Sequence, residues 1–204
     1  MTSNSSYNQY KEKIINCIQR HLGLNVRDVP VLYVDLVDFY KCIKSNYQLS
    51  SEFYDDIEGV KDRYKFLCEV ISGLYKWKDK KIYIKNKSKF DLSLLLAELL
   101  HSKSFTQDKS WIRKWISEGL THYLTKILCN ECDIKYIESG HRDYFVIWEK
   151  IHEKYDLEVL KTILFAQNMK ISVQILKHIF RYEKDDILQM TFENARSRLE
   201  LLGI

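Results

Sequence analysis

Three residues whose side chains bind metal ions occur in two nearby segments of the sequence. His101 ends the apolar stretch Leu95–His101, and Glu118 and His122 lie four positions apart within Trp115–Leu124. Residues four apart on a helix point in nearly the same direction, so Glu118 and His122 can converge on one point, which His101 can face from a neighbouring helix. Two histidines, one glutamate and an open position are a ligand set of catalytic zinc.

Glu98 supplies the second requirement of such chemistry, a group that moves protons. It lies one helical turn before His101, beside the position that the ligands would leave open. A carboxylate there can take a proton from water whose pKa the metal lowers. The alternative interpretation is an amphipathic helix whose leucines face the core. Ser93, Ala97, Glu98 and His101 would then face solvent.

Two helices would have to position these residues. Asp91 is a suitable N-cap for a helix over Leu92–Ser102, because its side chain can accept from the first free backbone N–H groups. Ser110 can cap a second helix that runs from Trp111 to about Cys129. The polar residues 103–110 would form the loop between them.

The remaining elements divide the chain into a mixed front and a helical back. We expect a helix over 7–22 ended by Gly23, a strand over 29–34, helices over 35–45 and 61–72, and a hairpin of 71–77 with 81–85. Within 61–72 a strand is the alternative, because Phe66, Cys68 and Val70 alternate as in a strand. Further helices are expected over 144–155, 157–168 after Asp156, 172–182 after Ser172, and 184–202. No repeat or flexible linker interrupts the sequence. The fold class predicted is therefore α+β, with a core over 1–130 and a helical C-terminal lobe over 131–204 in one compact unit.

The segment from Gly73 to Leu128 resembles the core of the zincin metallopeptidases, in the gluzincin or peptidase-MA-like branch. In that family a hairpin with an edge strand precedes a helix bearing H-E-x-x-H, and a second helix commonly carries tryptophan, a hydrophobic residue and Glu-Gly. Here Ile82–Ile84 is similar to the strand, Ala97–His101 to the first motif and Trp115–Gly119 to the second. The resemblance implies a mixed sheet packed beside active-site helices.

The same resemblance implies roles for individual residues. Glu98 matches the general base, His101 the second zinc histidine and Glu118 the glutamate ligand. Ala97 stands where the first zinc histidine belongs, and an alanine cannot bind metal. His122 is the candidate replacement, since the residue one turn after the glutamate often supports that histidine in related enzymes.

Two functions follow from this altered motif. In the first, the protein is a degenerate, weakly active or non-catalytic relative that binds a peptide or protein, with the edge strand of the hairpin pairing with an extended partner. In the second, it is an active zinc-dependent peptidase with His101, Glu118 and His122 as ligands and Glu98 as the base. Zinc is the cofactor that the resemblance implies. A non-catalytic relative of the first kind can have lost it.

Charge and composition bear on other partners. The 204 residues carry 32 Lys+Arg against 28 Asp+Glu, and this net charge of +4 is too mild to require nucleic acid or a membrane. Seven lysines occur in Lys76–Lys89 among aromatic residues, so a nucleic-acid-binding hairpin is a third function. We favour a lysine-protected edge hairpin, because no DNA- or RNA-binding motif accompanies it.

Cysteine placement and the N-terminus predict a cytoplasmic protein. Three of the five cysteines lie in apolar-periodic stretches, which is typical of reduced, buried thiols. Cys129 and Cys132 form a single C-x-x-C pair, interpreted as incidental thiols with a labile disulfide as the alternative. The N-terminus lacks a secretory signal, and the longest apolar run, Leu92–Leu100, is broken by Ser93 and Glu98, so no membrane span is expected.

Overall fold

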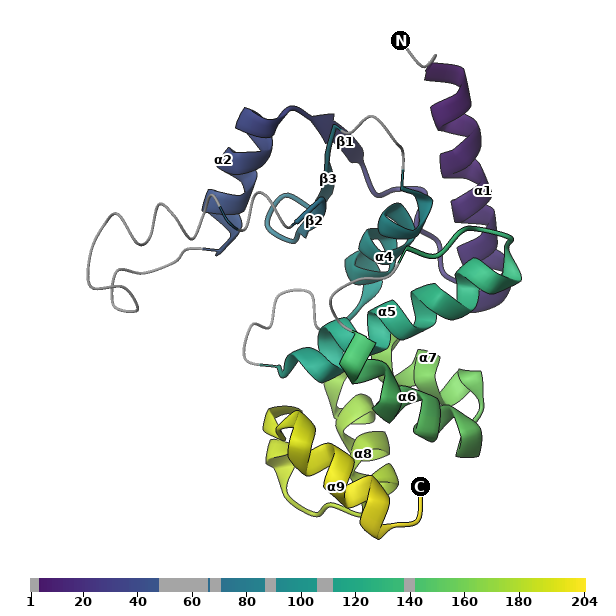
Figure 1. Cartoon of the computed structure of the whole chain (residues 1–204), viewed down its shortest axis with the longest axis vertical. Coiled ribbons are helices and arrows are strands. Elements are labelled where there is room, and N and C mark those ends of the chain that lie inside the picture. Colours follow the sequence, from purple (N-terminus) through teal and green to yellow (C-terminus); the bar gives the residue numbers. More distant parts are fainter. Residues whose placement is uncertain (1–3, 48–65, 67–70, 87–90, 106–111, 138–141) are drawn as a thin grey trace, which may run out of the picture.

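The computed structural model describes residues 4–47, 66, 71–86, 91–105, 112–137 and 142–204. They form an α+β fold in which α4 and α5 lie between the sheet with α2 at one end and helices α6–α9 at the other (Figure 1). In chain order the elements are α1 (Asn4–Leu22), β1 (Val31–Val34), α2 (Leu36–Tyr47), β2 (Gly73–Lys76), β3 (Lys81–Lys85), α4 (Leu92–Lys103), α5 (Lys114–Glu131), α6 (Arg142–Lys154), α7 (Leu157–Phe165), α8 (Met169–Ile179), the 3-10 helix η2 (Asp185–Gln189) and α9 (Phe192–Leu201).

The sheet has three strands in the order β1-β3-β2. Strand β1 runs parallel to β3, and β2 runs antiparallel to it, so the expected hairpin is confirmed. The first strand begins just after Pro30, as expected of a residue that has no backbone N–H to donate. The Pro30 carbonyl still accepts a hydrogen bond from the Ile82 amide at 2.9 Å. Because β3 is the central strand, β2 lies at one edge of this small mixed sheet.

Helices cover both faces of this sheet. Ile82 and Ile84 are buried in the main core, on the face of the sheet that contacts α4. Tyr83, which alternates with them, packs on the other face against Phe39 and Ile43 of α2. The alternation of side chains along a strand explains this division.

Helix α4 is enclosed rather than amphipathic. Its N-cap is Asp91, as expected, with the carboxylate accepting from the Leu94 amide at 3.0 Å. Ser93 is 3% exposed and Ala97 is 1% exposed. The solvent-facing stripe considered from the sequence is therefore wrong, because α4 is in contact with the sheet, α1 and α5 together.

Helix α5 begins later than the sequence suggests. Its first residue is Lys114 rather than Trp111, and its N-cap is Arg113, while Ser110 and Trp111 lie outside the described residues. The backbone N–H and the side chain of Arg113 donate to carbonyl oxygens of η2, at 3.1 Å and 2.9 Å. These bonds hold residue 113 in an extended conformation, so the helix begins after it.

The helix expected over 61–72 falls largely outside the described residues. The structure describes Phe66, as helical, and residues 71 and 72, which precede β2 and are not helical. The N-terminal helix and its end at Gly23 are confirmed, since Gly23 adopts a φ of 68° that favours glycine.

The C-terminal part is helical, with one cap predicted correctly and one incorrectly. Asp156 caps α7, accepting from the Val159 amide at 3.0 Å. Helix α8 begins at Met169 after the cap residue Asn168, so Ser172 is not its cap. Ser172 is buried inside that helix, and its hydroxyl donates to the Ile163 carbonyl at 2.8 Å.

The single last helix expected over 184–202 is also wrong. The chain forms η2 and then α9, separated by the extended residue Met190. The Met190 carbonyl accepts a hydrogen bond from the indole of Trp115 at 2.7 Å, and Thr191 caps α9 by accepting from the Asn194 amide at 3.2 Å. This contact with α5 and the following cap account for the break.

One continuous core joins residues 1–130 to the C-terminal helices. The rings of Trp115 on α5 and Trp148 on α6 stack at 5.5 Å, and the Trp148 indole donates to the Trp115 carbonyl at 2.7 Å. A Cβ atom at Gly119 would lie 2.7 Å from the Cβ of Tyr144 and 3.1 Å from the Trp148 indole nitrogen. Glycine is thus required for α6 to approach α5 so closely.

Two of the cysteines differ from expectation. Cys17 of α1 and Cys132 at the end of α5 form a disulfide, so these two are neither reduced nor incidental thiols. Cys129 is a free, buried thiol and does not pair with Cys132. The sequence could not reveal this pairing, because the two cysteines are 115 positions apart. Cysteine usage therefore no longer supports a reducing compartment.

Among the described residues, no helix combines the length and apolar character needed to cross a lipid bilayer.

We predict that Gly119→Ala lowers the free energy of unfolding by about 1–3 kcal/mol, because the added methyl group overpacks the α5–α6 contact. Urea denaturation followed by circular dichroism measures the effect. Lys114→Ala, at an exposed position of the same helix, is the control and should change stability by less than about 0.5 kcal/mol. Equal stability of the two variants would contradict the packing role of Gly119.

Candidate metal centre

The structure brings His101, Glu118 and His122 together between α4 and α5. The Nε2 atom of His101 lies 3.2 Å from Oε2 of Glu118, and Nε2 of His122 lies 3.8 Å from the same oxygen. The two imidazole rings are 6.0 Å apart, edge to face. One ligand atom from each residue falls within 4.8 Å of the others. The convergence expected from the sequence is present in the fold.

Buried leucines set the rotation of both helices. Leu99 and Leu100 precede His101 and are fully buried, as are Leu120 and Leu124 on either side of His122. With these apolar residues fixed in the core, the polar residues must point into the remaining space between the helices. The sequence pattern thus determines which face of each helix carries the cluster.

The cluster is open enough to admit an ion. The side chains of His101 and His122 are each 15% exposed, and that of Glu118 is 32% exposed. In tetrahedral zinc sites, nitrogen and oxygen ligands lie at about 2.0–2.1 Å from the metal and thus about 3.3 Å from each other. The separation of 3.2 Å between His101 and Glu118 already meets that value, and small rotations of the His122 side chain would complete it.

Charge interactions in the cluster favour a cation. Burial by itself lowers the pKa of His101, but the Glu118 carboxylate, its hydrogen bond and the charge of Glu98 outweigh burial and raise that pKa to about 9. The carboxylates therefore hold a proton on the imidazole when no metal is present. A divalent ion bound here would replace that proton, because a histidine must be deprotonated to ligate a metal.

Glu98 lies beside this cluster but is bonded to the sheet. Its Oε2 accepts a hydrogen bond of 2.6 Å from the backbone N–H of Tyr75 in β2. A Cβ at Gly73 would lie 3.2 Å from the Glu98 side chain, so glycine lets the strand pass close to it. Burial raises the pKa of Glu98 to about 7; nearby His101 opposes this change and Glu118 adds to it. This contact with the Tyr75 amide could not be predicted from the sequence.

A second group of metal-binding residues was missed from the sequence. Cys17, His21 and Cys132 also place one potential ligand atom each within 4.8 Å of one another. The spacing of Cys17 and His21, four positions apart on α1, was a usable signal. The third member comes from the end of α5 and could not be inferred.

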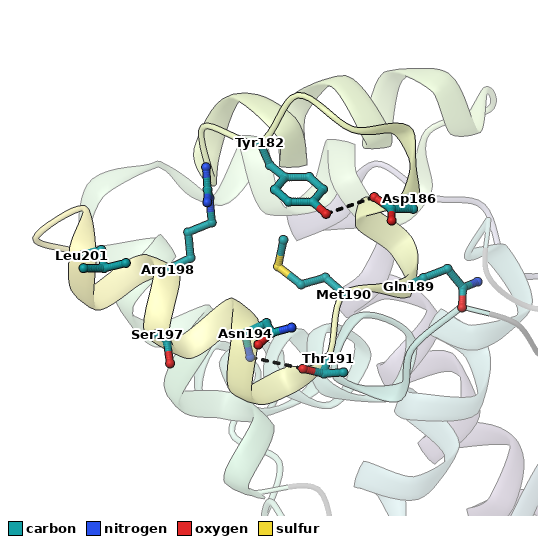
Figure 2. A pocket seen from close by; sticks show the side chains of 9 residues that line it. All are labelled: Tyr182, Asp186, Gln189, Met190, Thr191, Asn194, Ser197, Arg198 and Leu201. Carbon is teal, nitrogen blue, oxygen red and sulfur yellow. Dashed lines mark hydrogen bonds between the residues drawn. The ribbon is translucent and has the colours of Figure 1, made fainter.

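A shallow hollow occurs elsewhere, between η2 and α9 (Figure 2). Its volume is about 400 Å³. The hydroxyl of Tyr182 donates to Asp186 at 3.1 Å, and the Arg198 guanidinium lies over the Tyr182 ring. Arg198 also donates to backbone carbonyls at the end of α8, so its charge is already engaged. None of the metal-binding residues lines this hollow.

No family model, curated protein or solved structure matches this chain. The zincin resemblance of Gly73–Leu128 therefore rests on its residues alone. The structure has the coarser features that the resemblance implied, namely a small mixed sheet with an edge hairpin followed by two packed helices. A zincin core as such is not identified by these features, because other α+β folds share them.

We predict that Glu98→Ala destabilises the contact between α4 and β2. Loss of the carboxylate removes the acceptor of the Tyr75 N–H, and an unsatisfied, partly buried donor costs about 1–3 kcal/mol. Amide hydrogen exchange should therefore be faster at Tyr75 in Glu98→Ala. Glu98→Gln keeps a carbonyl acceptor and should preserve most of the protection. Unchanged exchange at Tyr75 in Glu98→Ala would contradict this contact.

Proposed function

We propose that this protein binds one zinc ion through His101, Glu118 and His122, in an altered zincin-like centre that serves peptide or protein binding and has little or no hydrolytic activity. The convergence of these three side chains from two helices carries the proposal. His122 takes the place of the ligand missing at Ala97.

The donor set favours zinc over harder cations. Imidazole nitrogens bind Zn²⁺ and other late transition metals well, whereas Mg²⁺ and Ca²⁺ prefer sites made of oxygen ligands. Three protein ligands would leave one position for water or a ligand carbonyl. A peptide carbonyl oxygen bound at that position would be polarised by the metal.

Two features support binding rather than rapid hydrolysis. Ala97 is buried on α4 and supplies no ligand, and the Glu98 carboxylate is already bonded to the Tyr75 amide. One of its two oxygens is thus engaged by the strand, which restricts the movement of the carboxylate toward water. The hydrogen bond to β2 therefore restrains the candidate base, Glu98, at the edge of the sheet.

The edge of β2 supports a peptide as the bound partner. Strand β2 lies at the edge of the sheet, with β3 on its other side. A peptide that adds to such an edge accepts hydrogen bonds from its outward N–H groups. The Tyr75 N–H is already held by Glu98, so such a peptide would pair with the other outward backbone groups of this edge.

An active zinc peptidase is the second candidate function. The observation that favours it is the position of Glu98, one turn before His101 and close enough to both His101 and Glu118 for their charges to change its pKa. Once released from Tyr75, this carboxylate could act as a general base toward water at the open position.

Zinc content tests the proposed centre. Protein purified without a histidine tag, in the disulfide form, should hold about one zinc ion per chain by elemental analysis. Zinc at about 100 times its dissociation constant should raise the free energy of unfolding by about 2.7 kcal/mol. His101→Ala and His122→Ala should each weaken binding by about 100-fold or more, because even outer-shell partners of ligands contribute about 10- to 100-fold.

The exposed residue His178 provides the matched control, and His178→Ala should bind zinc as the wild type does. Substoichiometric zinc that is unchanged in His101→Ala and His122→Ala would overturn the proposed centre. Ala97→His tests the resemblance separately: if position 97 corresponds to the first zinc histidine, this variant should bind zinc more tightly.

Peptide hydrolysis separates the two candidate functions. A mixed peptide substrate incubated with zinc-loaded protein should show no zinc-dependent cleavage, because Glu98 remains bonded to the strand. Cleavage that falls by about 10²–10⁴-fold in Glu98→Gln, with zinc content unchanged, would instead establish the peptidase. Mass spectrometry of the products measures both outcomes.

A further inference from the structure

The group formed by Cys17, His21 and Cys132 lies apart from the proposed zinc centre in its residues and its chemistry. Cys17 and His21 are one turn apart on α1, and Cys132 ends α5. Their potential ligand atoms lie within 4.8 Å of one another. Two sulfurs and one imidazole nitrogen thus meet at one place, from segments far apart in the sequence.

The group can be reached from solvent and can accommodate a reduced state. Cys17 is 4% exposed, whereas His21 and Cys132 are both partly exposed. A small reductant can therefore approach the disulfide from the side of Cys132. The Cys17 sulfur lies 3.7 Å from the Leu128 carbonyl oxygen, which can accept a hydrogen bond from the thiol after reduction.

We infer that reduction of the Cys17–Cys132 disulfide creates a zinc site in which Cys17, Cys132 and His21 are the protein ligands. A dithiol reductant supplies the two electrons: its two thiols become a disulfide, and Cys17 and Cys132 become thiols. These two thiols lose their protons to solvent when they bind Zn²⁺ as thiolates, and the oxidation state of zinc does not change. In the reverse step a small-molecule disulfide takes up the two electrons and becomes two thiols, the Cys17–Cys132 bond forms again, and Zn²⁺ is released.

The geometry of the two states explains why they exclude each other. Sulfurs bonded to each other have no thiolate charge to offer a metal. Zinc holds sulfur at about 2.3 Å, so two tetrahedral sulfur ligands lie about 3.8 Å apart. The Cα atoms of Cys17 and Cys132 are 6.2 Å apart, so rotation of the two side chains can separate the sulfurs without moving the helices. Two thiolates and one imidazole, with one open position, are an established ligand set for zinc.

Cys129 offers a matched control within the same C-x-x-C pair. It is fully buried and lies outside the group. Burial, with a smaller contribution from Asp91, raises the pKa of its thiol to about 12, so it stays protonated. Removal of this thiol should leave the inferred site intact.

Cobalt titration tests the inference, because Co²⁺ replaces zinc and reports its ligands by absorption. The full-length protein is reduced with a phosphine, freed of reductant without oxygen, and titrated with Co²⁺ beside the disulfide form. The reduced protein should show a sulfur-to-cobalt charge-transfer band in the near ultraviolet, and the disulfide form should show none. His101→Ala/His122→Ala should keep the band, which separates this site from the proposed zinc centre.

Variants decide which residues hold the metal. His21→Ala keeps both cysteines and should weaken cobalt binding by about 100-fold or more, while Cys129→Ser should bind as the wild type does. A reduced wild type without the band would overturn the inference. So would His21→Ala with unchanged affinity, or a loss of the band in Cys129→Ser when circular dichroism shows that this variant is folded.

Discussion

The candidate function depends on one constraint, the pairing of α4 with α5 so that a carboxylate and two imidazoles share a partly buried space. Glu118 lies within 3.2 Å of His101 and 3.8 Å of His122, and a carboxylate out of bulk water needs such partners. The buried leucines of both helices fix the rotation of each helix. Gly119 lets α6 pack closely against α5. The polar cluster is therefore held by apolar packing around it.

Local features of the fold could be predicted where short-range chemistry decides them. Asp91 and Asp156 as caps, Gly23 as a helix end and the alternation of Ile82 and Ile84 all follow from neighbouring residues. Boundaries set by distant contacts could not be predicted. Helix α5 begins late because Arg113 is bonded to η2, and the last helix is broken where Met190 accepts from Trp115. In both places, tertiary contacts override the local pattern.

The site shows the same division between local and distant determinants. Glu118 and His122 share a helix face by spacing alone, and His101 needed only a packed neighbouring helix. The bond between Glu98 and the Tyr75 amide was beyond the sequence, because it depends on how closely β2 passes α4 at Gly73. That bond changes the interpretation of Glu98 from a free base to a residue held by the sheet. The pairing of distant cysteines could not be predicted for a related reason, since no local pattern specifies it.

The measurement that tests the central claim most directly is an anomalous difference map, recorded at the zinc absorption edge, from crystals of the disulfide form grown with zinc. The proposal predicts one strong peak between α4 and α5, at about 2.0–2.2 Å from nitrogen atoms of His101 and His122 and from a carboxylate oxygen of Glu118. A fully occupied zinc peak elsewhere, with none among these three side chains, would contradict the account.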